Sequence, residues 1–213
     1  MKTDELINLL ASGEGPVDRH ALLRRLGLAL LGGGLGALLL TLTLYGVRSD
    51  LASVAPTPLF WGKVALPASL ALLALLLTRR LARPGVKGGA AWGLLAVPLA
   101  LVWLGAALSL ADAAPQARSG LVFGSTWRTC ALNIGLLSLP TFIAVFYALR
   151  GLAPTRLRQA GAASGLLAGS TATLAYCLHC PEMGIPFWGI WYLLGMLLPT
   201  LAGAVLGPRL LRW

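Results

Sequence analysis

Long uncharged runs alternate along the chain with short clusters of Arg and Lys. A membrane-spanning helix needs about 20 consecutive residues that are mostly apolar. The pattern predicts an all-α membrane protein with six transmembrane helices. The expected spans cover residues 26–45, 59–78, 89–110, 130–149, 160–177 and 187–206. Lys63 falls near one end of the second span, and we expect its long side chain to reach the membrane surface.

The basic residues set the expected orientation, because Lys and Arg concentrate in cytoplasmic loops. With the N-terminus in the cytoplasm, most of them lie inside, and the outer pieces carry only Arg48, Lys63, Arg118 and Arg128. We therefore expect a multi-pass protein with both termini in the cytoplasm. The chain then divides into a cytoplasmic segment, residues 1–24, and a six-helix transmembrane domain, residues 25–213.

Composition argues against a soluble protein. Of the 213 residues, 57% are hydrophobic and 11% are charged, and the mean hydropathy is +0.80. A soluble domain of this size could not bury so much apolar surface. The net charge of +10 suggests a nucleic acid, but the basic residues cluster at helix ends, where they face anionic lipid. We expect membrane lipids as partners and no direct contact with nucleic acid.

The predicted spans carry no charged residue near their centres. Transporters and pumps usually need one at that depth. The pattern therefore disfavours transport, although a metal transporter component stays an alternative.

The N-terminal stretch "TDELINLLAS" predicts a short amphipathic helix, with acidic residues at its positive N-terminal end. A helix this short is marginal in water and needs a surface to lie on. Its acidic polar face disfavours the anionic inner leaflet, so a groove on a partner protein is expected, with the protein's own loops as an alternative. The expected partner-binding residues are Asp4, Glu5, Leu6, Ile7, Leu9 and Leu10.

The stretch "YCLHCPE" holds two of the three cysteines, Cys177 and Cys180, and Cys130 begins the fourth expected span. The predicted topology places Cys130 and Cys180 at similar depth on the outer side. They are candidates for a switchable thiol pair, for a permanent disulfide, or for no special role. Cys177 lies about one helical turn deeper. It is either a plain buried cysteine or a third sensor thiol.

Metal binding is a second interpretation of the same stretch. Thiolates favour soft or borderline ions such as copper, cadmium or zinc, which would act as a signal rather than as an obligatory cofactor. Arg128 is placed to lower a thiol pKa or to pair with Glu182. The candidate ligands are Cys130, Cys180, His179 and Glu182.

Short motifs in a fixed order resemble the NrsF-type membrane anti-sigma factors. They are "TDELINLLA", "GVRSDL", "FWGK", "WRTC", "HCPE", "WYLLGM" and the terminal "RW". The resemblance implies a six-helix protein of the bacterial inner membrane that binds an extracytoplasmic-function (ECF) sigma factor through its N-terminal segment. It also implies that periplasmic cysteines sense metal or oxidative stress. The matching positions are Cys130 in "WRTC" and Cys180 in "HCPE", whereas Cys177 is outside the family pattern.

The expected function is therefore regulatory rather than enzymatic. The protein would sequester an ECF sigma factor and release it under stress. The main alternative is a membrane thiol oxidoreductase that uses the C-x-x-C of Cys177 and Cys180 with a quinone. A relay of that kind normally needs a second dithiol, and only Cys130 remains.

Overall fold

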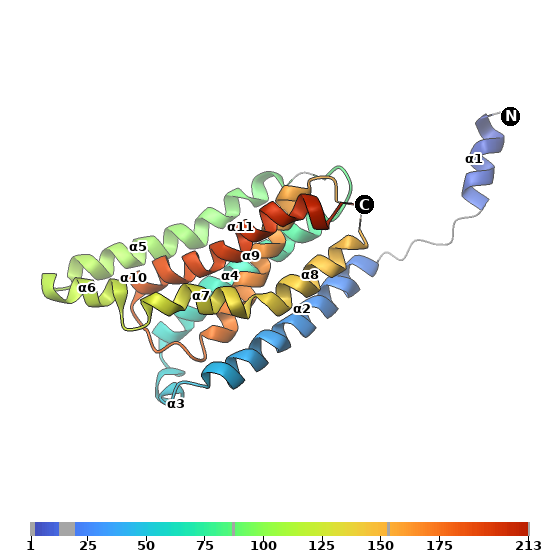
Figure 1. The fold of residues 1–213 in the computed structure, drawn as a ribbon. Coiled ribbons are helices and arrows are strands. Elements are labelled where there is room, and N and C mark those ends of the chain that lie inside the picture. The colour runs from blue at the N-terminus through green and yellow to red at the C-terminus, as the bar shows by residue number, and fades with distance from the viewer. Residues whose placement is uncertain (1–2, 13–19, 87, 153, 213) are drawn as a thin grey trace.

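The computed structural model describes residues 3–12, 20–86, 88–152 and 154–212, and every regular element in them is helical. A bundle of long helices contains most of these residues, and α1 (Thr3–Ser12) lies apart from it (Figure 1). The expected all-α class is therefore confirmed. Residues Leu9 and Leu10 belong to α1, but their side chains are outside the described part of the structure.

The bundle begins with α2 (Ala21–Leu40), which ends in a π-helical turn, η1 (Thr41–Tyr45). The other elements follow in chain order. They are α3 (Leu51–Val54), α4 (Pro58–Leu81), η2 (Gly89–Ala91), η3 (Gly93–Leu95), α5 (Ala96–Asp112), α6 (Pro115–Phe123), α7 (Trp127–Leu137), α8 (Leu139–Arg150), α9 (Leu157–Tyr176), α10 (Ile185–Phe187), the π-helical turn η4 (Trp188–Tyr192) and α11 (Leu193–Leu210).

Five helical stretches in the described residues are long and apolar enough to cross a membrane. They contain the first, second, third, fourth and sixth expected spans. The fifth expected span corresponds to α9, a single helix of 20 residues that is less apolar than these five. The sixth crossing therefore stays a prediction.

Helix α9 is the central helix of the bundle, and most of its residues are buried. It packs against α4, α8 and α11, so little of it would face lipid. Its serine and threonine hydroxyl groups are satisfied within the helix: Ser164 Oγ donates to the Ala160 carbonyl at 2.7 Å, and Thr173 Oγ1 donates to the Gly169 carbonyl at 2.8 Å. Burial by other helices explains why this sequence can be polar at the centre of a membrane protein.

Glycines let α9 and α11 touch at the backbone. A Cβ added at Gly161 would collide with the Gly203 carbonyl, and one at Gly165 would collide with the Pro199 carbonyl. Glycines four residues apart, Gly161 and Gly165 on α9 and Gly203 and Gly207 on α11, thus form the closest helix pair in the bundle. A similar contact joins α2 to α8, where Gly33 faces Thr141 and Gly36 faces Pro140.

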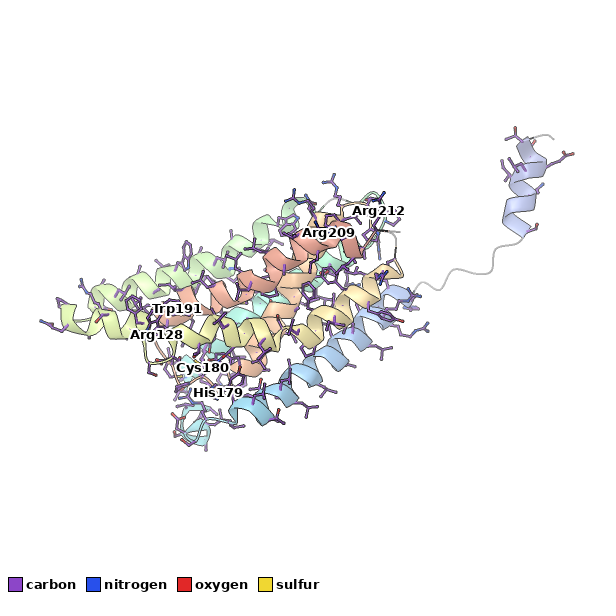
Figure 2. All side chains as sticks on the ribbon, in the orientation of Figure 1. Arg128, His179, Cys180, Trp191, Arg209 and Arg212 are labelled. Carbon is purple, nitrogen blue, oxygen red and sulfur yellow. The ribbon has the colours of Figure 1, made fainter. Side chains whose placement is uncertain are left out.

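The two ends of the bundle differ in chemistry. Figure 2 shows Arg209 and Arg212 at one end and Arg128, His179, Cys180 and Trp191 at the other. Helix α2 begins at the end where Arg209 and Arg212 lie (Figure 1). The thiols therefore lie at the far end of α2 from the N-terminal segment.

We expect Gly165→Ala to lower the free energy of unfolding by about 1–3 kcal/mol, because the new methyl group must push α9 and α11 apart. Gly32→Ala is the matched control, since nothing lies within 4 Å of its added Cβ. That change should stabilise α2 by about 1 kcal/mol through helix propensity. Thermal unfolding in detergent checks both signs. Equal changes in the free energy of unfolding for Gly165→Ala and Gly32→Ala would contradict the close contact between α9 and α11.

Candidate functional site

Three cysteines from different elements converge at one end of the bundle. Cys130 lies on α7, Cys177 caps the C-terminus of α9, and Cys180 lies in the loop before α10. All three are buried free thiols in one core cluster, together with aromatic side chains from α9 and η4. The side chains of Cys130 and Cys180 interact directly. We call these three residues the thiol cluster.

The chain turn after α9 brings Cys180 back towards Cys177. The backbone N–H groups of His179 and Cys180 both donate to the Tyr176 carbonyl at 3.0 Å, which closes a tight turn at the helix end. The π-helical turn η4 places Tyr192, fully buried, against the same thiols. A π-turn adds one residue to a helical turn and often marks a functional site.

Lys63 differs from its prediction. Its side chain does not reach the membrane surface but is fully buried. Its Nζ donates to the carbonyl oxygens of Cys180 at 2.6 Å and Glu182 at 2.9 Å, and lies 5.8 Å from the centre of the Tyr192 ring. The carbonyl groups of this loop face inward and accept hydrogen bonds from the ammonium group, so the side chain does not extend to the membrane surface. A cation inside an apolar span is the sequence signal that could have identified this residue.

Arg48 supports the same loop from the other side. Its guanidinium donates to Asp50 through Nε at 2.6 Å and Nη2 at 2.7 Å, a two-point pair. Its Nη1 donates to the Cys180 carbonyl at 3.1 Å and contacts Met183 Sδ at 3.4 Å. Hydrogen bonding to Arg48 lowers the pKa of the Asp50 carboxyl below its ordinary value. Two cations therefore donate to the carbonyl of one cysteine.

Arg128 and Glu182 do not form the expected pair. Arg128 lies over the Trp127 ring, 5.2 Å from its centre. Glu182 Oε1 instead accepts from the backbone N–H groups of Ser125 at 2.7 Å and Thr126 at 3.2 Å, and from Ser125 Oγ at 2.7 Å. The carboxylate thus accepts from backbone N–H groups that have no partner within α7. It connects the loop that contains Cys180 to the helix that contains Cys130.

The four predicted metal ligands are only partly brought together. The thiols of Cys130 and Cys180 meet, but His179 Nδ1 lies 3.2 Å from the Gly46 carbonyl and Glu182 bonds to the start of α7. In the described ranges of the chain, no three His, Cys, Asp or Glu residues group in a way that could hold a metal ion. The donor set as folded does not fit a formed metal centre.

The predicted partner-binding residues lie on α1 (Figure 1), and α2, which follows it in the chain, begins at the end of the bundle opposite Cys180 (Figure 2). Asp4 and Glu5 lie in its first turn. Leu6 is 42% exposed and Ile7 is 56% exposed. Large apolar side chains that stay exposed on a short helix are typical of a segment that binds a partner.

The fold and this site define a helical protein with the spans of a membrane protein and a buried set of thiols. The chain belongs to the family described as NrsF, "Negative regulator of sigma F", whose model matches residues 10–213. The resemblance predicted from the motifs is therefore confirmed. The family consists of regulators rather than enzymes, as expected, and this argues against the thiol oxidoreductase.

Two relatives match over their whole length and the whole of this chain. The "Probable anti-sigma-F factor NrsF" of Azospira oryzae is 48% identical over 213 residues. The "Anti-sigma-F factor NrsF" of Caulobacter vibrioides is 40% identical over 214 residues. No solved structure matches the chain.

We expect Glu182→Ala to lower the free energy of unfolding by about 1.5–3 kcal/mol, because it removes a charged acceptor from donors at the start of α7. Asp112→Ala, which removes the exposed acid at the end of α5, is the control and should change little. Thermal unfolding in detergent measures both. If Glu182→Ala changed the free energy of unfolding as little as Asp112→Ala does, the contact of Glu182 with the start of α7 would contribute no stability.

Proposed function

We propose that this protein is an inner-membrane anti-sigma factor. It sequesters an ECF sigma factor through its cytoplasmic N-terminal segment and releases it when periplasmic thiols are oxidised or bind a soft metal ion. The observation that carries the proposal is the family match over residues 10–213, because it supplies the regulatory class that the fold alone lacks. The names of both relatives agree with it.

Charge supports the proposed orientation. Arg209 and Arg212 lie at the end of the bundle opposite Cys180 (Figure 2), and α2 begins there with Arg24 and Arg25 in its first turns. Cytoplasmic ends of membrane helices carry such basic residues. This orientation puts the thiol cluster in the periplasm of a bacterial envelope, where oxidising conditions favour disulfides.

Helix α2 offers a physical link between the two ends. At its outer end, the backbone N–H of Arg48 donates to the Leu178 carbonyl at 3.0 Å, and His179 Nδ1 lies 3.2 Å from the Gly46 carbonyl. Its inner end leads back along the chain towards α1. A change in the loop of residues 178–183 can therefore bias the position of α2, provided that the sigma factor prefers one of the two arrangements.

The exposed apolar residues of α1 supply the first test. Ile7→Asp should cut co-purification of the cognate ECF sigma factor with the full-length protein at least about tenfold, because a charge would be buried unpaired in the interface. Asn8→Asp adds the same charge at the neighbouring exposed position of α1 and should bind nearly as wild type. Retained capture by Ile7→Asp would show that this face of α1 is not the contact.

The thiols supply the second test. Cys130→Ser combined with Cys180→Ser should keep the sigma factor bound during treatment with peroxide or cadmium, because no thiol pair remains to react. Cys177→Ser should still release it if Cys177 is only a core residue. Reporter transcription from a promoter of that sigma factor measures release. Normal induction in the double variant would contradict sensing by this pair.

A further inference from the structure

Met183 lies in the loop between α9 and α10, and its side chain is partly exposed. The other sulfur-bearing side chains that the structure describes are buried: Cys130, Cys177, Cys180 and Met196 are each no more than 1% exposed. Oxidation of sulfur side chains follows their exposure to the oxidant. An oxidant in the surrounding water therefore meets Met183 before it meets any of the three thiols.

The sulfur atom of Met183 lies against a guanidinium group that is fixed in place. Its Sδ is 3.4 Å from Arg48 Nη1, and Arg48 is only 8% exposed. Asp50 holds the other two nitrogens, Nε at 2.6 Å and Nη2 at 2.7 Å. Nη1 is thus the guanidinium nitrogen that serves the loop, and it also donates to the Cys180 carbonyl at 3.1 Å. A single donor atom connects Met183 and Cys180 to the same fixed cation.

A sulfoxide at Met183 would change this contact. A thioether sulfur is only a weak hydrogen-bond acceptor, whereas a sulfoxide oxygen is a polar acceptor that suits a cationic donor. The oxygen needs about 2.7–3.2 Å to a nitrogen donor, so it does not fit between Sδ and Nη1 unless the sulfur moves outward. Asp50 prevents the guanidinium from following, and the loop must move instead. Lys63 still binds the Cys180 carbonyl at 2.6 Å, so the loop loosens without unfolding.

We propose that Met183 is an oxidation site that controls access to the thiol cluster: a peroxide converts its thioether to a sulfoxide, Arg48 binds the sulfoxide oxygen, and the loop moves outward to expose Cys130 and Cys180. This inference rests on the proposed sensing function and supplies a step that it lacks, because thiols at 0% exposure do not meet an oxidant in the resting fold. The sulfoxide admits the oxidant, and the reaction of the thiols still causes release.

The oxidation is a two-electron transfer of one oxygen atom. A lone pair on the Met183 sulfur attacks one oxygen of hydrogen peroxide, an S–O bond forms, and the O–O bond breaks. The second oxygen leaves as hydroxide and takes the proton of the transferred hydroxyl group, which gives water. The thioether loses two electrons and the peroxide gains them. Methionine sulfoxide reductases reverse the change, so the site can be reset.

The test uses the full-length protein in lipid nanodiscs, which is treated with hydrogen peroxide, freed of it, and then reduced with dithiothreitol. Dithiothreitol reduces disulfides and sulfenic acids but leaves methionine sulfoxide intact. Peptide mass spectrometry gives the rate of sulfoxide formation, which should be at least about tenfold higher at Met183 than at the buried Met196.

Alkylation with iodoacetamide then measures access to the thiols. Cys180 should react about tenfold faster after the peroxide treatment, because the loss of a hydrogen bond from a charged donor shifts the opening equilibrium of the loop by that factor.

Four variants separate the methionine from other effects of peroxide. Met183→Leu keeps the volume of the side chain and cannot form a sulfoxide, so alkylation of Cys180 should stay slow after the treatment. Met196→Leu is the matched control and should respond as the wild type does. Met183→Gln places a polar acceptor beside Arg48 and should speed alkylation about tenfold without peroxide. Arg48→Leu lacks the donor to the Cys180 carbonyl, so it should react fast from the start and gain nothing from peroxide.

Equal rates of sulfoxide formation at Met183 and Met196 would overturn the proposal, and so would faster alkylation of peroxide-treated Met183→Leu. A sulfoxide at Met183 that leaves the alkylation of Cys180 unchanged would overturn it as well. If a Met183 variant fails to fold, the wild type decides, because treatment with a methionine sulfoxide reductase must return the alkylation rate to its starting value. Sigma-factor capture by the untreated protein is a separate result. Its absence would remove the proposed function, while the sulfoxide and alkylation rates would still decide this inference.

Discussion

Backbone contact between α9 and α11 is the constraint on which the rest of the bundle depends. Gly161 and Gly165 have no side chain to separate the two helices, and Gly203 faces them from α11. Because other helices enclose α9 on several sides, its side chains are mostly small and partly polar rather than uniformly apolar. Its end is then fixed at the centre of the bundle, where Cys177 and the turn to Cys180 follow. The packing of small residues in the membrane therefore determines where the thiols lie.

The thiol end of the bundle is stabilised mainly by bonds to backbone carbonyls. Lys63 and Arg48 both donate to the Cys180 carbonyl, and Glu182 accepts from the N–H groups that precede α7. These bonds do not involve the sulfur atoms themselves. A reaction that displaces Cys180 would therefore displace the loop that these bonds hold.

The sequence was a good guide to the helices and a poorer guide to the loop. Long apolar runs identify spans such as α4 and α5 because lipid contact requires apolar residues along their length. α9 is the weakest case, since its composition reflects helix contact rather than lipid contact. The resemblance and the C-x-x-C pattern drew attention to Cys130 and Cys180. The hydropathy pattern predicts a surface position for Lys63, because it carries no information about which carbonyl groups a folded loop turns inward.

The position of Arg128 likewise could not be predicted from the sequence. Its position two residues before Cys130 suggests a role beside the thiols, yet its side chain lies over the Trp127 ring. The cations that reach Cys180 come instead from α4 and from the loop after η1, since Lys63 and Arg48 both donate to its carbonyl. Which residues of distant helices come together depends on how the helices pack, and that packing cannot be deduced from a single sequence.

Helix α2 together with η1 spans 25 residues, so in the proposed mechanism it would carry a shift at its thiol end to its other end as a rigid body. Its contact with α8 is close, because Gly33 and Gly36 have no side chain to hold Thr141 and Pro140 away. Hydrogen bonds hold both of its ends: Arg48 N–H to Leu178 at the thiol end, and Arg25 Nη1 to the Gly151 carbonyl, 2.9 Å apart, at the other. In the proposed mechanism, a change in the loop that carries Cys180 therefore acts on α2 through the bond at its thiol end.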